Sequence, residues 1–163
     1  MGKPEMPPQP LDLYRGPVQP EWIDYNGHMN IAYYVVAFDR ATDRLFDRLD
    51  LGRDYVKRAN CSAFVMEMHI GYERELKRGD PLRIATQLID ADAKRLHLFH
   101  AMYHAEAGFR AATIEMLLVH VDLDGPRSTP FPAPQRATIE TVLAEHRALE
   151  RPPQLGRVIG IRR

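Results

Sequence analysis

Cysteine and serine are both scarce in this chain of 163 residues, which has one cysteine, Cys61, and two serines, Ser62 and Ser128. One cysteine excludes an internal disulfide and a multi-cysteine metal site, and it favours a reducing compartment such as the cytoplasm. Neither serine lies in a Gly-x-Ser-x-Gly turn, so the sequence does not predict a serine-hydrolase site. Cys61 opens an apolar segment and is better explained as a core residue than as a nucleophile.

Net charge and long apolar runs are missing as well. The 22 basic and 22 acidic residues cancel, which argues against nucleic acid or a membrane surface as the main partner. No stretch approaches the roughly eighteen consecutive apolar residues of a membrane-spanning helix. The proline-rich residues 1–10 predict a disordered lead-in rather than a signal peptide. Length and hydrophobic content predict one domain over residues 11–150, followed by a tail over residues 151–163.

A polar loop over residues 20–30 leads into the strongest helical pattern of the chain. From Ile31 to Leu49 the apolar residues recur at intervals of three and four, and the opposite stripe alternates aspartate with arginine. Asn30 stands where an N-cap is expected and Gly52 follows the end of the pattern. We therefore expect a helix of about nineteen residues, roughly 28 Å long.

From Cys61 onward the apolar spacing changes to two, which is the period of a β-strand. Short turns divide this region into predicted strands over residues 61–75, 82–90, 95–106 and 109–122. On one face of the first strand we expect Phe64, Met66, Met68, Ile70 and Tyr72. We expect the strands to form an antiparallel meander.

Shorter elements flank this helix and sheet. The sequence predicts an edge strand over residues 11–19, a short helix over residues 53–58 and a closing helix over residues 135–150. One long amphipathic helix against a curved antiparallel sheet makes an α+β fold, and the other face of the sheet needs cover. A homo-oligomer, either a dimer or a tetramer, would supply it.

The chain resembles the hotdog fold over about Leu13 to Asp122, and within it the acyl-CoA thioesterases of the 4-hydroxybenzoyl-CoA type. The segment Asp24-Tyr25-Asn26-Gly27-His28-Met29-Asn30 resembles an Asp-x-Asn-x-His-x-Asn segment of related acyl-carrier-protein thioesterases. Residues 69–82 resemble the second-strand hairpin of the superfamily. Residues 20–30 and 91–100 are similar to the betainyl-CoA thioesterases of carnitine breakdown. His28 follows Asp24 by four residues, whereas many relatives place the histidine later.

This resemblance implies hydrolysis of a thioester by residues of the polar loop. Asp24 is the candidate general base on water, or the direct nucleophile through a transient anhydride, and the sequence leaves both open. His28 is a candidate for orienting water or donating to the carbonyl. Asn26 and Asn30 would fix the geometry. Gly27 would let the backbone approach the substrate, and the amides of residues 27–30 are candidate oxyanion donors.

Other residues are candidates for binding the substrate. A trimethylammonium acyl group needs aromatic faces and an acid, and the candidates are Trp22, Tyr25, Tyr33 and Glu115. The phosphates of coenzyme A need exposed cations, and the candidates are Arg74, Lys77, Arg78, Lys94 and Arg95. His97, His100 and His104 do not share one strand face, so we predict no metal site, and no cofactor beyond the coenzyme A of the substrate.

Three interpretations of function are foremost on the sequence, ahead of a hotdog dehydratase, whose histidine lies on a differently spaced motif at the helix start. The first is a thioesterase for a short acyl-CoA, with betainyl-CoA as the named candidate. The second is a thioesterase for aromatic or fatty acyl groups. The third is a catalytically silent hotdog protein that binds acyl-CoA or serves as a structural dimer.

Overall fold

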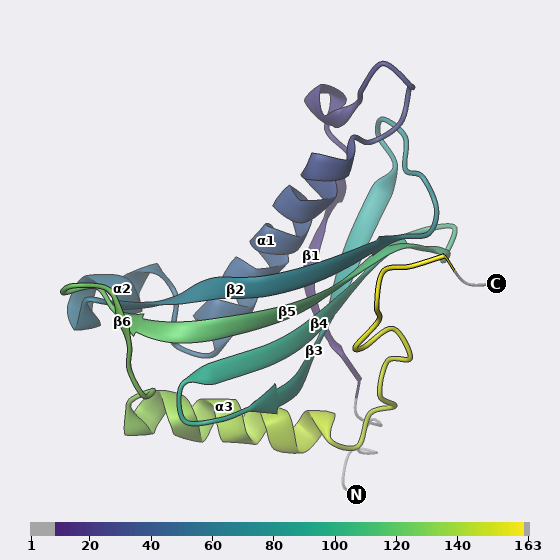
Figure 1. Ribbon diagram of the computed structural model, residues 1–163. Helices are drawn as coiled ribbons and strands as arrows, with labels where there is room; N and C mark the ends of the chain where they lie inside the picture. Colours follow the sequence, from purple (N-terminus) through teal and green to yellow (C-terminus); the bar gives the residue numbers. More distant parts are fainter. Residues whose placement is uncertain (1–8, 162–163) are drawn as a thin grey trace, which may run out of the picture.

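The computed structural model describes residues 9–161, so most of the predicted lead-in lies outside the described residues (Figure 1). The elements in chain order are β1 (Leu11–Pro17), the 3-10 helix η1 (Pro20–Trp22), α1 (Ile31–Arg48), α2 (Arg53–Ala59), β2 (Cys61–Tyr72), β3 (Pro81–Ala91), β4 (Arg95–His104), β5 (Arg110–Asp122), β6 (Arg127–Ser128) and α3 (Ala133–His146). Helices against an antiparallel sheet confirm the predicted α+β class.

The strands form one antiparallel sheet in the order β1-β3-β4-β5-β2, with β6 paired to β5. β3, β4 and β5 form the predicted meander. β2 does not belong to it, because β2 pairs with β5 rather than with β3. The prediction of a hairpin between β2 and β3 was therefore wrong. The connecting residues 73–80 are no tight turn: they bury Leu76 and carry the chain from one side of the sheet to the other.

A β-bulge in β2 reverses the faces that the sequence predicted for its first half. Val65 and Glu67 pair with the adjacent residues Leu118 and Leu117 of β5, so Met66 is an additional residue in β2. Val65 consequently shares a face with Met68, while Phe64 points to the opposite face. The single alternation predicted from Phe64 to Tyr72 was wrong because one inserted residue exchanges the two faces of a strand.

The core lies between α1 and the inner face of the sheet, which curves around the helix (Figure 1). Asn30 caps α1 as predicted, since its Oδ1 accepts the N–H of Ala32 at 3.0 Å. The buried stripe of the helix consists of Tyr34, Ala37, Phe38, Ala41, Thr42 and Leu45. Facing it are apolar residues of the central strands, among them Leu82, Ile84, Leu88, Leu98, Met102, Ile114, Met116 and Leu118. Among residues 9–161, no helix has the length and apolar content needed to cross a membrane.

The C-terminal part of the chain covers further surfaces of the sheet. α3 lies beside β3, where the ring Nδ1 of His146 accepts the N–H of Leu88 at 2.8 Å (Figure 1). Residues 151–156, which we call the C-terminal strap, follow α3 onto the outer face of the sheet, the face turned away from α1. Gly156 donates its N–H to Glu115 Oε2 at 2.7 Å. Part of the predicted tail is therefore packed against the domain.

His100 connects α1 to the sheet from inside the core. Its ring is fully buried, with Nε2 3.0 Å from the hydroxyl of Thr42 on α1 and Nδ1 2.7 Å from the hydroxyl of Thr86 on β3. The ring also stacks on Phe38 with a centroid distance of 5.9 Å. Burial lowers the pKa of His100 to about 3, because a charged ring would lose its hydration.

This buried ring predicts a specific loss of stability in acid. An unfolded histidine takes up a proton below about pH 6.5, whereas folded His100 stays neutral down to about pH 3. The folded state therefore binds fewer protons in this window, and its free energy of unfolding falls by up to about 1.4 kcal/mol for each pH unit of acidification. Urea unfolding of the wild type and of His100→Gln between pH 4 and pH 7 measures this contribution. We expect the variant to be less stable at pH 7 but to lose less stability in acid; equal slopes would contradict the assignment.

Candidate active site

Residues 23–29 form a narrow loop that ends at the N-terminus of α1. Ile23 and Met29 pair as an isolated antiparallel bridge, and the N–H of Asp24 donates to the carbonyl of His28 at 3.0 Å. Gly27 closes the turn at φ +78, a left-handed conformation that glycine adopts readily, and donates its N–H to the carbonyl of Asp24 at 3.0 Å. The backbones of Asp24 and His28 are thus held side by side.

Backbone hydrogen bonds fix this loop to the rest of the domain. The N–H of Met29 donates to the carbonyl of Leu76 at 2.8 Å, and the N–H of Asn30 donates to the carbonyl of Trp22 at 2.8 Å. The N–H of Leu76 in turn donates to the hydroxyl oxygen of Tyr34 at 3.2 Å. Leu76 is a positioning residue that the sequence analysis missed, because a contact made by backbone atoms leaves no signal in the side-chain pattern.

The Asp24 carboxylate is half-buried and is oriented by two neighbours of the loop. Its Oδ1 accepts the N–H of Asn26 at 2.8 Å, and its Oδ2 lies 3.4 Å from Nδ2 of Asn30. Each carboxylate oxygen can accept more than one hydrogen bond, so both retain capacity for a water or a substrate. The ring of His28 is also half-buried, and among the described residues it has no hydrogen-bond partner. Asp24, Asn26, Gly27, His28 and Asn30 are therefore brought together, as the sequence suggested.

The backbone amides offer fewer oxyanion donors than the sequence suggested. Of the four amides from Gly27 to Asn30, those of Gly27, Met29 and Asn30 already donate to carbonyls of the chain. Within residues 9–161 the amide of His28 is the one of the four without such an acceptor. The positive end of the α1 dipole adds a favourable potential for an anion at the same place.

The aromatic candidates differ in how accessible they are. Trp22 is buried and stacks on Tyr33 at a centroid distance of 5.8 Å. The guanidinium of Arg40 lies 5.0 Å from the Trp22 ring centre, so a cation of the chain itself already occupies this ring. Tyr25, at the tip of the loop, is 98% exposed. Tyr25 is thus the aromatic residue of the loop whose faces are open.

The acidic candidate Glu115 lies elsewhere. It is on the outer face of the sheet, since its neighbour Met116 faces inward to contact Thr42. Its carboxylate contacts His97 Nε2 at 2.7 Å and the N–H of Gly156 at 2.7 Å. The structure therefore does not bring Glu115 to the loop within one chain, and these contacts explain how an acid is accommodated in an apolar strand.

The basic candidates fall into two groups at opposite ends of β3 and β4. Arg74, Lys77 and Arg78 adjoin the loop, because they flank the Leu76 carbonyl that binds Met29. Lys94 lies in the turn between β3 and β4, and Arg95 begins β4. There Arg95 pairs with Asp92 and holds the pKa of that carboxyl down to about 2. Within one chain only the first group is next to the loop.

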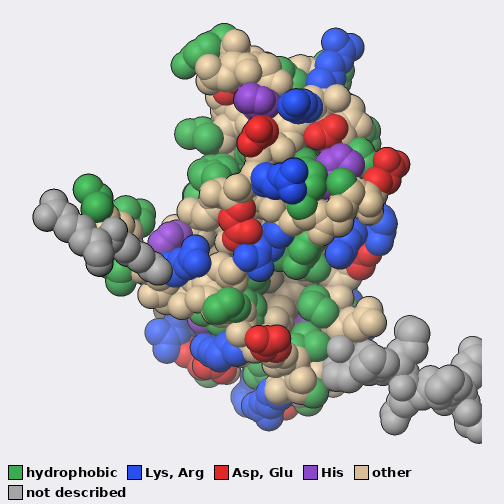
Figure 2. All heavy atoms as spheres, turned by 90° about the vertical axis from the view of Figure 1, so that its right-hand side faces the viewer, with side chains coloured by type: hydrophobic (Ala, Val, Ile, Leu, Met, Phe, Trp, Pro, Cys, Tyr) green, Lys and Arg blue, Asp and Glu red, His purple; other side chains and the backbone are tan. Residues whose placement is uncertain are grey.

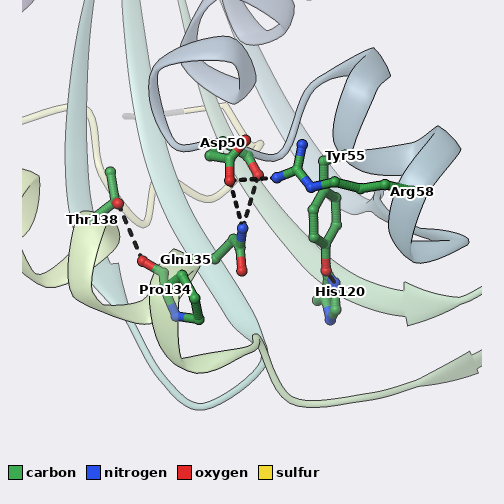
Figure 3. Close-up of polar contacts among 7 residues, drawn as sticks. All are labelled: Asp50, Tyr55, Arg58, His120, Pro134, Gln135 and Thr138. Atoms are coloured by element: carbon green, nitrogen blue, oxygen red, sulfur yellow. Dashed lines mark hydrogen bonds and ion pairs between the residues drawn. The ribbon is translucent and has the colours of Figure 1, made fainter.

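A second set of polar side chains lies at the other end of α1 and joins the helices to the sheet (Figure 3). Gln135 Nε2 donates to Asp50 Oδ2 at 2.7 Å, and Asp50 also pairs with Arg58, which lowers the pKa of the Asp50 carboxyl. Tyr55 contacts His120 Nε2 at 2.8 Å, and burial raises the pKa of Tyr55 to about 12. These residues bond one another, so their role is structural.

Comparison with known proteins agrees with the geometry. The sequence pattern of the thioesterase-like superfamily matches residues 18–142. The chain is 42% identical to a betainyl-CoA thioesterase of Pseudomonas aeruginosa over 94% of this chain and 96% of that protein. It is 34% identical to an L-carnitine dehydrogenase/betainyl-CoA thioesterase of Rhizobium meliloti over 94% of this chain, which spans about a third (31%) of that longer protein.

Solved structures show the same architecture. A putative thioesterase from Pseudomonas putida superposes with a TM-score of 0.83 at 36% identity, covering 94% of this chain and 98% of that one. A hypothetical protein from Staphylococcus aureus, solved in complex with CoA, superposes with a TM-score of 0.87 at 28% identity and the same coverage. The chain therefore belongs to the thioesterase-like superfamily and has the hotdog fold of its thioesterases.

Proposed function

We propose that this thioesterase hydrolyses betainyl-CoA to betaine and free coenzyme A, with Asp24 as the residue that drives the attack. The observation that carries the proposal is the Asp24 carboxylate, half-buried in the loop before α1 and oriented by Asn26 and Asn30 with hydrogen-bonding capacity to spare. The likeness to betainyl-CoA thioesterases over nearly the whole chain supports the choice of substrate. With Cys61 as its one cysteine, the chain suits the reducing cytoplasm.

Two routes for Asp24 are compatible with this geometry. As a general base, the carboxylate takes a proton from water, the water oxygen bonds to the acyl carbon, and the carbon–sulfur bond breaks to release the thiolate. As a nucleophile, a carboxylate oxygen bonds to the acyl carbon, the thiolate leaves, and water then hydrolyses the mixed anhydride. In both routes negative charge develops on the carbonyl oxygen. The amide of His28 and the positive end of α1 would stabilise it.

Recognition of the acyl group falls mainly to Tyr25. In a betainyl ester a single methylene separates the trimethylammonium group from the reacting carbonyl, so the aromatic face that binds it must adjoin the catalytic carboxylate. Tyr25 follows Asp24 directly, and its ring is open. Trp22 and Tyr33 stack on each other, and Arg40 already lies over Trp22, so we assign these two rings a supporting role in the loop. An exposed aromatic face binds a quaternary ammonium through its negative π-face.

The active form we propose is a homodimer formed through β2. This strand of 12 residues is an edge of the sheet, and long apolar edges are normally paired or protected. Val65, Met68 and Tyr72 are 44%, 50% and 46% exposed, and Ile31 at the start of α1 is 64% exposed. Pairing β2 with its copy would cover these residues and place the acyl site between the two subunits.

The same dimer accounts for both groups of basic residues. Arg74, Lys77 and Arg78 adjoin the loop of their own chain. A two-fold axis through the middle of β2 turns the Lys94–Arg95 end of one subunit toward the loop end of the other. We propose that the two groups together bind the phosphates of coenzyme A.

Asp24→Asn tests the catalytic assignment, because it keeps the shape of the side chain and removes its charge. We expect kcat with betainyl-CoA to fall by about 10³-fold, as for loss of a general base, while the Kd for coenzyme A stays within twofold. Asp124→Asn, the same change in the exposed turn before β6, is the control and should retain full turnover. Normal turnover of Asp24→Asn would exclude both routes.

Gly27→Ala tests whether the shape of the loop matters for turnover. Gly27 and Gly125 both have positive φ, at +78 and +68, and an added Cβ meets nothing within 4 Å at either position. Each substitution should therefore cost about 1–2 kcal/mol of backbone strain in unfolding experiments. We expect only Gly27→Ala to lower kcat/KM, by about tenfold or more, because it displaces Asp24 relative to the substrate. Equal activities of the two variants would contradict this role of the loop.

Tyr25→Leu tests the recognition of positive charge. The comparison uses betainyl-CoA and 3,3-dimethylbutanoyl-CoA, in which a neutral carbon replaces the quaternary nitrogen. We expect kcat/KM for betainyl-CoA to fall about 5- to 30-fold, the range of a cation–π contact, and kcat/KM for the neutral ester to change little. Tyr25→Phe keeps the aromatic face and should retain the preference. A parallel loss for both esters would show that the ring only packs against the substrate.

A further inference from the structure

The C-terminal strap crosses the outer face of the sheet in one direction, toward the β2 edge. Residues 150–154 lie over the outer side chains of β3 and β4, where they share a hollow of about 240 Å³ with Gln87, Phe99 and Tyr103. Gly156 then bonds Glu115 on β5. Gly156 and Arg157 line a second hollow, of about 390 Å³, together with Glu67 and His69 of β2. The chain has therefore run from β3 across β4 to β5 and reached β2 by Arg157.

The described residues that follow, 158–161, include three aliphatic side chains that no other part of residues 9–161 covers. Val158, Ile159 and Ile161 are 83%, 89% and 90% exposed. Figure 2 shows the last described residues projecting from the body of the molecule and carrying hydrophobic side chains. Aliphatic side chains gathered at one place and left exposed to this degree indicate an interaction surface. We call residues 158–161 the C-terminal arm.

The outer face of the sheet carries an apolar patch at the other end of β2. Phe64 faces outward opposite Val119 of β5, and Leu117, two residues away, shares that face. Phe64 is 43% exposed, and Leu117 and Val119 are partly exposed. The strap of the same chain arrives at β2 beside Glu67 and His69 and shares its hollow there with Leu117, the near edge of the patch, while Phe64 and Val119 do not line that hollow.

A second copy of the chain brings the arm and the patch together. In an isologous dimer each contact is made twice, with the two surfaces exchanged. A two-fold axis through the middle of β2 (Cys61–Tyr72) places His69 opposite Phe64 of the partner subunit. The arm leaves its own sheet next to His69. Four extended residues span about 13 Å, and neighbouring strands lie about 4.8 Å apart, so the arm is long enough to cross the seam.

We propose that the C-terminal arm crosses the dimer seam and packs on the outer face of the partner subunit, over the patch of Phe64, Leu117 and Val119. This inference rests on the β2 dimer of the proposed function. In an extended arm Ile159 and Ile161 point to the same side, so both can contact the patch. Two arms related by the two-fold axis then clasp the two sheets from outside, opposite to the face that carries the active sites.

Disulfide trapping between two different chains tests the exchange. Both carry Cys61→Ala, so that the native thiol is absent; one carries Phe64→Cys and the other Ile159→Cys, with distinguishable tags. After mixing and mild oxidation we expect a covalent heterodimer on a non-reducing gel. The control replaces Phe64→Cys with Glu140→Cys, an exposed position on α3, and should give no cross-link. A dimer in solution without the Phe64–Ile159 cross-link would overturn the arm exchange while leaving the proposed function intact.

Two further results would contradict the exchange: a disulfide formed within one chain, and a protein that forms no dimer. A variant that carries both Phe64→Cys and Ile159→Cys gives the opposite test. If it forms the disulfide within one chain and stays a monomer, the arm packs on its own sheet and the proposal is overturned. A protein that sediments as a monomer would overturn both the exchange and the β2 dimer.

Truncation after Arg157 measures what the arm contributes. We expect the dimer dissociation constant to rise about tenfold or more, because three aliphatic side chains lose a buried site. At concentrations where the truncated protein remains dimeric, thioesterase kcat should equal that of the full chain, since the arm lies away from the loop. An unchanged dissociation constant would contradict the proposal.

Discussion

The side chain of Asn30 connects the long helix to the candidate catalytic carboxylate. Its Oδ1 accepts the N–H of Ala32 and so starts α1, while its Nδ2 lies 3.4 Å from the carboxylate of Asp24. The backbone of the same residue bonds the carbonyl of Trp22. Any shift of α1 along the sheet is therefore transmitted to Asp24. The buried stripe of α1 and the His100 ring between Thr42 and Thr86 set that position from the core.

Half-exposed apolar side chains follow the β2 edge on both faces of the sheet. On the inner side Met68 and Tyr72 are half-exposed beside the start of α1, and on the outer side Phe64 is half-exposed beside the end of the strap. A folded monomer that kept all these side chains in water would be prone to association. One pairing of β2 with its copy would cover the inner set, and exchange of the C-terminal arms would cover the outer set. Assembly and the closing of the acyl site then become the same event.

Local patterns in the sequence were sufficient to predict much of this fold. The period of three and four gave α1, with Asn30 as its cap, and the period of two gave the strands. The bulge at Met66 was not predictable in this way, because one inserted residue leaves the apolar composition of β2 unchanged. The pairing of β2 with β5 depends on contacts far apart in the chain. Hairpin reasoning, which favours neighbours in sequence, therefore assigned β2 the wrong partner.

The candidate site was predictable to the extent that it is a contiguous segment. Residues 24–30 are held together by bonds within the segment, and so the motif alone indicated them. Glu115 was selected as an isolated charge in an apolar strand, and its partners His97 and Gly156 come from another strand and from the strap. Trp22 was selected for its proximity to Asp24 in sequence. Only the fold reveals that Arg40, two turns into α1, already lies over its ring.

The central claim is that a carboxylate-led thioesterase selects a cationic acyl group. Its most direct test is release of free thiol by the purified protein from betainyl-, acetyl-, benzoyl- and palmitoyl-CoA under identical conditions. We predict that kcat/KM is highest for betainyl-CoA and at least tenfold above that of each other ester. A higher value for the benzoyl or palmitoyl ester would contradict the cationic site, and coenzyme A binding without turnover of any ester would contradict catalysis itself.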